Sequence, residues 1–122
     1  MAGADAIGVS NQGGRQLDGA PSSIACLPAV VNAVGGRAEV FLDGGVRQGQ
    51  DILRARALGA AGVLTGRATL YGMAAAGEEG VLQVLRLMHG ELRSTMAMCG
   101  IDHIDEANGD VLVPSGPPPR QA

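Results

Sequence analysis

Three short segments of the sequence bring glycine together with arginine, a combination that suits a negatively charged ligand. They cover residues 10–19, 42–47 and 65–67. Glycine lets the backbone approach a ligand closely, and backbone N–H groups exposed in this way can cradle an anion. The arginine guanidinium is a rigid fork that binds a carboxylate or a phosphate at two points. The sequence therefore predicts three anion-binding loops.

The first segment offers a clamp for a carboxylate. Arg15 lies among glycines in residues 10–19, and its guanidinium can hold both oxygens of a carboxylate. Taken alone, Arg15 is equally compatible with a solvated surface arginine.

The second and third segments suit a phosphate. Gly45 and Arg47 follow one predicted strand, and Gly66 and Arg67 open a short helix after another. A helix start attracts phosphate through its free N–H groups. Asp43 would repel a phosphate at close range, so we predict that it accepts hydrogen bonds from ligand hydroxyls. The alternative is a plain turn with ordinary helix capping. Two adjacent anion sites reinforce each other and favour phosphate binding.

The elements that must position these loops alternate between strand and helix. Apolar runs predict strands over residues 4–10, 39–43 and 61–65, and the loops follow their carboxyl ends. Helices are expected around residues 28–34, 48–58, 66–73 and 77–98, with Pro28 in a first turn. This order predicts a parallel sheet covered by helices, with ligand sites at the carboxyl ends of its strands. In the last helix, the side chains expected to face the protein core are Val81, Leu85, Met88, Leu92 and Met96.

Length and composition limit the class of protein. The 122 residues are 46% hydrophobic and 17% charged, which predicts one globular domain over residues 1–113 and a disordered proline-rich tail over 114–122. A whole (β/α)8 barrel needs about 250 residues. A net charge of −3 and 2% aromatic residues argue against nucleic-acid binding. All nine cationic residues are arginines, so lysine chemistry is excluded.

The remaining features predict a cytoplasmic protein without a membrane span or a metal. No basic, apolar leader is visible, and arginine or proline interrupts the apolar stretches. Cys26 and Cys99 are far apart, so we expect two buried thiols in a reducing compartment; a disulfide or a metal site is the alternative.

Taken together, the three segments resemble the FMN-dependent 2-hydroxy-acid dehydrogenases and oxidases, which include L-lactate dehydrogenase, glycolate oxidase, lactate oxidase and mandelate dehydrogenase. The motifs that carry the resemblance are SNQGGRQLD over residues 10–18, FLDGGVR over 41–47 and GR over 66–67. The resemblance runs from about Gly3 to about Glu106. It implies an α/β fold that forms the C-terminal part, strands six to eight, of a (β/α)8 TIM barrel.

The resemblance also implies a role for each site residue. Arg15 would bind the substrate carboxylate, and Asp43 and Arg47 would contact the ribityl-phosphate part of FMN. The residues expected to hold the phosphate are Gly45, Gly66 and Arg67. The implied activity is oxidation of a small (S)-2-hydroxy acid to the 2-oxo acid, with FMN as the electron acceptor.

Two departures from the family pattern bear on activity. Gln12 stands where the family has the histidine that takes a proton from the substrate, and a glutamine amide does not titrate near neutral pH. The first five strands of the family barrel, with further pocket residues, have no counterpart here. We therefore expect an impaired fragment that needs the N-terminal half of the barrel or self-associates. The alternatives are a noncatalytic FMN- or phosphate-binding half-barrel module and a purely structural half-barrel that dimerises.

Overall fold

Strands and helices alternate along the chain. The computed structural model describes residues 3–113. Its strands are β1 (Ala6–Val9), β2 (Glu39–Asp43) and β3 (Gly62–Leu64), and its α-helices are α1 (Ser23–Val34), α2 (Gly49–Ala57) and α3 (Arg67–Met98). Three 3₁₀ turns complete the set: η1 (Gln12–Gly14), η2 (Ile104–Glu106) and η3 (Gly109–Val111).

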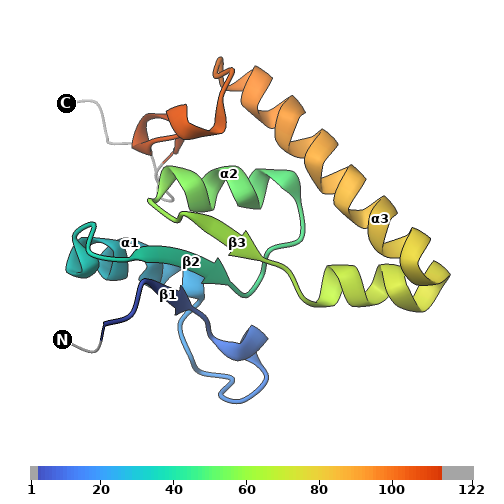
Figure 1. Cartoon of the computed structure of the whole chain (residues 1–122), viewed down its shortest axis with the longest axis horizontal. Coiled ribbons are helices and arrows are strands. Elements are labelled where there is room, and N and C mark those ends of the chain that lie inside the picture. Colours follow the sequence, from blue (N-terminus) through green and yellow to red (C-terminus); the bar gives the residue numbers. More distant parts are fainter. Residues whose placement is uncertain (1–2, 114–122) are drawn as a thin grey trace, which may run out of the picture.

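The three strands form one parallel sheet in the order β1-β2-β3 (Figure 1). In its register, Val9 lies opposite Leu42, and Leu42 lies opposite Val63. Because all strands run in one direction, the loops that follow them leave from the same edge of the sheet. The three glycine- and arginine-bearing segments therefore meet in space, as the sequence predicts.

The core lies between one face of the sheet and helices α1 and α2. Val40 and Leu42 of β2 are buried and alternate with the half-buried Phe41 and Asp43. Leu27 of α1 and Ala55 of α2 belong to the same buried cluster as the two β2 side chains. Side chains alternate between the faces of a strand, so Asp43 points to the face that these helices leave open.

Helix α1 begins earlier than the sequence indicates. Pro28, expected in the first turn, lies inside the helix, which starts at Ser23. The Ser23 hydroxyl donates a hydrogen bond to the carbonyl of Gly44, 3.2 Å away, and Leu27 is fully buried. These contacts stabilise the first turn, although Pro28 has no N–H to donate within the helix.

Helix α3 is two helical segments that meet at a sharp corner. Ala76 and Gly77 have non-helical backbone angles, so the break falls where the expected second helix begins. Gly72 and Gly80 lie backbone to backbone across this corner, and a Cβ on Gly80 would lie 1.9 Å from the Gly72 carbonyl oxygen. The corner sends the longer segment back along the molecule towards α2 (Figure 1).

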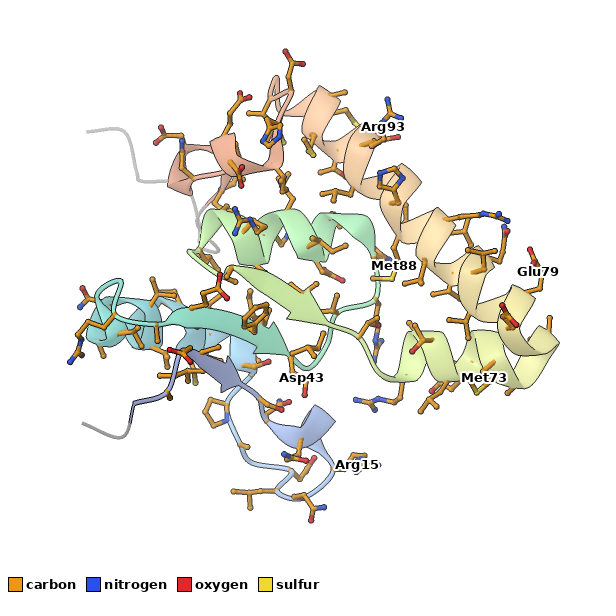
Figure 2. All side chains as sticks on the ribbon, in the orientation of Figure 1. Arg15, Asp43, Met73, Glu79, Met88 and Arg93 are labelled. Atoms are coloured by element: carbon orange, nitrogen blue, oxygen red, sulfur yellow. The ribbon has the colours of Figure 1, made fainter. Side chains whose placement is uncertain are left out.

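The longer segment of α3 packs against α2 through Met88. Met88 is buried and points towards α2, whereas Arg93 on the same helix points away (Figure 2). Gly49, at the start of α2, donates its N–H to the Glu91 carboxylate at 2.8 Å. The expectation that Leu85 also faces the core is wrong, because 47% of its surface is exposed. Val84, one residue earlier and one helical turn before Met88, packs on the core instead.

The structure also bears on the expectations for the two cysteines, for a membrane span and for the C-terminal tail. The two thiols are not both buried: Cys26 is half-buried and Cys99 is exposed at the end of α3. Within residues 3–113, none of the helices combines the length and the apolar character needed to cross a bilayer. The predicted disordered tail, residues 114–122, lies outside the described residues.

The close approach of α2 and α3 yields a stability prediction. A Cβ on Gly49 would lie 2.1 Å from the Leu92 backbone nitrogen and 2.5 Å from the Met88 carbonyl oxygen, so Gly49→Ala should force the helices apart. We expect a loss of about 3 kcal/mol in the free energy of unfolding, measured by urea denaturation. Gly90→Ala is the matched control, because nothing lies within 4 Å of its Cβ position on α3. That change should stabilise by roughly 0.5–1 kcal/mol, and equal losses would contradict the packing.

Candidate functional site

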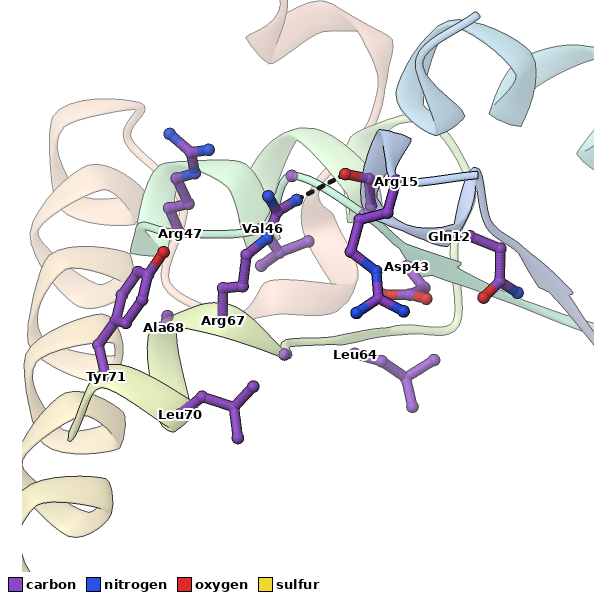
Figure 3. Close-up of a pocket in the computed structure, with 14 residues that line it drawn as sticks. Gln12, Arg15, Asp43, Val46, Arg47, Leu64, Arg67, Ala68, Leu70 and Tyr71 are labelled. Atoms are coloured by element: carbon purple, nitrogen blue, oxygen red, sulfur yellow. Dashed lines mark hydrogen bonds between the residues drawn. The ribbon is translucent and has the colours of Figure 1, made fainter. Parts of the chain in front are cut away.

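An open cavity of about 500 Å³ lies at the carboxyl edge of the sheet. Its walls come from the loops after all three strands and from the first turns of α3 (Figure 3). The lining residues are Gln12, Gly13, Arg15, Asp43, Gly44, Gly45, Val46, Arg47, Leu64, Gly66, Arg67, Ala68, Leu70 and Tyr71.

All seven site residues predicted from the sequence line this one cavity. Gln12 and Arg15 come from the loop after β1, and Asp43, Gly45 and Arg47 from the end of β2 and its loop; Gly66 and Arg67 stand at the start of α3. The structure thus brings together three arginines that lie as many as 52 residues apart in sequence. Their individual roles stay predictions.

A chain of hydrogen bonds connects the loop after β1 to Asp43. The Ser10 hydroxyl donates to the Asp43 carboxylate at 2.8 Å, and the Gln12 backbone N–H donates to the Ser10 hydroxyl oxygen at 3.1 Å. This chain fixes one oxygen of the carboxylate from the protein side. It holds the Asp43 carboxylate on the cavity wall, and the role of Asp43 as an acceptor for ligand hydroxyls stays a prediction.

The loops after β1 and β2 pack directly on each other. A Cβ on Gly44 would lie 2.6 Å from the Asn11 side-chain oxygen and 2.9 Å from the Ser23 hydroxyl. Only a residue without a side chain leaves room for Asn11 here. Gly44 therefore serves the close packing of the two loops, whereas nothing lies within 4 Å of the Cβ position of Gly45.

The starts of α2 and α3 differ in how their N–H groups are satisfied. At α2, the Asp51 carboxylate accepts hydrogen bonds from the backbone N–H groups of Arg47 and Gln48, at 3.0 and 3.1 Å. At α3, Gly66 caps the helix with no side-chain hydrogen bond. A helix start whose N–H groups lack side-chain acceptors attracts an anion. Of the two helix starts, that of α3 is therefore the one left open to an anion.

The sequence reasoning missed two features of the cavity. Arg67 donates a hydrogen bond from Nη2 to the carbonyl of Gly13 at 2.7 Å, which ties the start of α3 to the loop after β1. Tyr71, 70% exposed, lines the cavity one helical turn after Arg67. The helical spacing of four residues is a signal that could have placed Tyr71 beside Arg67. No comparable signal exists for the contact with Gly13.

Comparison with known proteins identifies the family. The family described as FMN-dependent dehydrogenase matches residues 1–114. The chain belongs to the FMN-dependent dehydrogenase family. It is 53% identical over 110 residues to an L-lactate dehydrogenase of Caulobacter vibrioides, and 51% identical over 118 residues to a pre-mycofactocin synthase of Mycobacterium tuberculosis.

The structural comparison agrees with the family. A mandelate oxidase structure with benzoyl-formic acid matches with a TM-score of 0.82 and 50% sequence identity, over 86% of this chain and 31% of that one. The two sequence relatives are matched over 90% and 94% of this chain, and each over 29% of its own length. The chain thus spans about a third of the length of these family members.

The family cofactor is FMN, and the cavity has the features that its phosphate requires. Nothing lies within 4 Å of the positions where a Cβ would stand on Gly45 and Gly66, so the backbone is open to the cavity there. Arg47 and Arg67 line the same cavity (Figure 3). Within residues 3–113, no group of three or more His, Cys, Asp or Glu side chains gathers as a metal site would require.

The backbone N–H groups of Arg47 and Gln48 are already bonded to the Asp51 carboxylate. We therefore predict that Arg47 contacts the phosphate of FMN through its side chain. We expect Arg47→Ala to weaken FMN binding about tenfold, or roughly 1.5 kcal/mol for one solvent-exposed charged hydrogen bond. Riboflavin, which lacks the phosphate, should bind almost equally to both forms. Flavin fluorescence titration of the chain, supplemented with a polypeptide carrying the remaining strands, measures both affinities.

The control for this titration is Arg37→Ala. The Arg37 side chain donates to the Ala33 and Val34 carbonyls at the end of α1 and does not line the cavity. Equal losses for FMN and riboflavin in Arg47→Ala would show that Arg47 does not face the phosphate.

Proposed function

We propose that this chain supplies strands six to eight, with their helices, of the (β/α)8 barrel of an FMN-dependent 2-hydroxy-acid oxidoreductase. One observation carries the proposal: a candidate carboxylate clamp and a candidate phosphate site line the same cavity at the carboxyl edge of a parallel sheet. A 2-hydroxy acid needs the first site and FMN needs the second. The names of the L-lactate dehydrogenase and mandelate oxidase relatives agree with this substrate class.

The roles proposed for the residues follow from their chemistry. Arg15 holds the substrate carboxylate with its guanidinium fork. Asp43, already oriented by Ser10, accepts a hydrogen bond from a ribityl hydroxyl of FMN. Gly45, Arg47, Gly66 and Arg67 hold the phosphate. When bound, FMN would supply the electron acceptor as the alcohol carbon of the substrate is oxidised to a carbonyl.

Gln12 sets the limit on catalysis by this chain. It lies on the same loop as Arg15 and on the same cavity wall, where the family resemblance places the proton-accepting histidine. Its amide can donate a hydrogen bond to the substrate oxygen and accept one from it, but it cannot take up the hydroxyl proton. We propose that substrate binding is retained and that oxidation is impaired.

A binding module without catalysis is the second candidate function. Gln12 at the position of the family's histidine favours this second function, because all the other predicted site residues serve to bind substrate or FMN. Turnover of L-lactate, glycolate or mandelate by the completed barrel separates the two functions, since a noncatalytic module binds FMN without reducing it.

The open face of the sheet requires a partner. Leu64 of β3 is 53% exposed, Ile7 of β1 is 39% exposed, and Leu70 lies beside the cavity with 60% exposed. We propose that the remaining barrel strands cover this surface, and that a second copy of the chain covers it when they are absent. The prediction of a cytoplasmic location remains untested.

The exposed apolar surface predicts self-association of the isolated chain. Size-exclusion chromatography should show oligomers or a loosely packed species with weak amide-exchange protection in β1 and β3. A polypeptide that carries the remaining strands should convert these species into one compact complex. A monomer with strong, cooperative protection would contradict the half-barrel assignment.

Restoring the base gives the sharpest test of the proposed function. In the completed barrel, Gln12→His should raise the rate of FMN reduction by at least about 10²-fold, because general-base catalysis contributes about 10²–10⁴-fold. The substrate dissociation constant should change little, since the lost step acts on the transition state. The regained rate should rise with pH as the histidine loses its proton. Stopped-flow flavin absorbance, recorded across substrate concentration and pH, measures the rate, the substrate dissociation constant and the pH dependence.

The matched control is Gln16→His, which places a histidine on the same loop at a residue that does not line the cavity. It should leave the rate unchanged. A glutamine form that already reduces FMN as fast as the Gln12→His form would show that another group is the base.

A further inference from the structure

Arg67 joins the two ends of the cavity. Its side chain reaches from the first residue of α3 to the carbonyl of Gly13, where Nη2 donates a hydrogen bond at 2.7 Å (Figure 3). Arg67 and Gly13 are 54 residues apart in sequence. Gly13 lies between Gln12 and Arg15, the two residues proposed to contact the substrate. The contact therefore links the proposed phosphate end to the proposed carboxylate end.

The loop that receives this hydrogen bond has an unfavourable backbone conformation. Gln12, Gly13 and Gly14 have φ angles of 55°, 66° and 72°, three successive residues in the left-handed region. For Gln12 this conformation costs roughly 1–2 kcal/mol. Strained backbone persists where its surroundings hold it, and the guanidinium of Arg67 is one such support from outside the loop.

The guanidinium can hold the loop and an anion at once. It carries five N–H donors in a rigid fork, and the bond to Gly13 uses one of its two terminal nitrogens. Arg67 also lines the cavity beside Gly66 and Arg47. An anion bound there would fix the side chain in the position that supports the loop.

We propose that Arg67 is a positioning residue that couples the two binding events. Occupation of the phosphate end by FMN holds Arg67 against Gly13, and the ordered loop then presents Gln12 and Arg15 to the substrate carboxylate. FMN thereby raises the affinity for the 2-hydroxy acid, and by linkage the acid raises the affinity for FMN equally. This coupling rests on the proposed function, whereas the support of the loop by Arg67 stands without it.

The chain offers a matched pair of variants to test the contact from the loop side. A Cβ on Gly13 would lie 2.9 Å from Arg67 Nη2, so Gly13→Ala displaces the guanidinium while leaving it available to a phosphate. Gly14→Ala imposes a similar left-handed strain, at φ +72°, but nothing lies within 4 Å of its Cβ position. The difference between the two variants isolates the contact from the strain.

The first measurement needs no ligand. In the full chain, amide hydrogen exchange at Gly14 and Arg15, whose N–H groups bond to Asn11 and Gln12 within the loop, should accelerate at least about fivefold in Arg67→Ala and Gly13→Ala. Exchange in β2 should stay unchanged, which excludes global unfolding. Gly14→Ala should show a clearly smaller effect at Arg15. Equal acceleration in both glycine variants, or none in Arg67→Ala, would overturn the support of the loop by Arg67.

The second measurement tests the coupling. L-lactate is titrated by NMR at the Arg15 amide with saturating FMN, with riboflavin and without flavin. FMN, but not riboflavin, should tighten L-lactate binding at least about fivefold, the lower end of typical couplings. The enhancement should fall below twofold in Arg67→Ala and Gly13→Ala and persist in Gly14→Ala.

The outcomes of the two measurements separate the two proposals. FMN and L-lactate that bind independently would overturn the coupling and leave the proposed function standing. A chain that binds neither FMN nor L-lactate, even with the remaining strands supplied, would overturn the proposed function and the coupling with it. The exchange data would then still decide whether Arg67 supports the loop.

Discussion

Burial of one face of the central strand is the constraint on which the rest of the structure depends. Val40 and Leu42 of β2 are only 4% and 2% exposed, and they share a cluster with Leu27 and Ala55 from the two covering helices. Burying a side chain of this size contributes about 1.5–3 kcal/mol. A shift of the strand by one residue would expose both and turn Asp43 into the core, because strand side chains alternate with a period of two. The burial of Val40 and Leu42 therefore stabilises the sheet and also directs the Asp43 side chain to the opposite face.

The distribution of negative charge decides where an anion can bind. Asp51 and Glu91 both place a carboxylate at the start of α2, where Asp51 accepts hydrogen bonds from the N–H groups of Arg47 and Gln48 and Glu91 accepts one from Gly49. The start of α3 has no such side-chain cap, and Gly66 keeps its approach open. Of the two helix starts at this edge of the sheet, only that of α2 has backbone N–H groups already bonded to a carboxylate.

We propose that ligand binding and proton transfer are separated in this chain. Arginines and glycines that suit FMN and a carboxylate are present, and the chain belongs to the FMN-dependent dehydrogenase family. Gln12, a neutral amide, stands where the family resemblance places the proton-accepting histidine, and we propose that this impairs proton transfer. The relatives are matched over about a third of their length, and we propose that the remaining barrel strands complete the cavity. The described cavity is accordingly open and lined by exposed apolar side chains such as Leu64 and Tyr71.

The sequence by itself determined the alternation of strands and helices, the carboxyl-edge loops and the seven candidate residues. These follow from local chemistry: apolar runs, glycine at the ends of elements, and arginine beside glycine. Tertiary contacts decided the rest. Contacts of Leu27 and Ser23 stabilise a start of α1 ahead of Pro28, and Val84 rather than Leu85 packs on the core. The bond from Arg67 to Gly13 joins residues 54 positions apart, and no local pattern encodes it, because it exists only once the parallel register has brought their loops together.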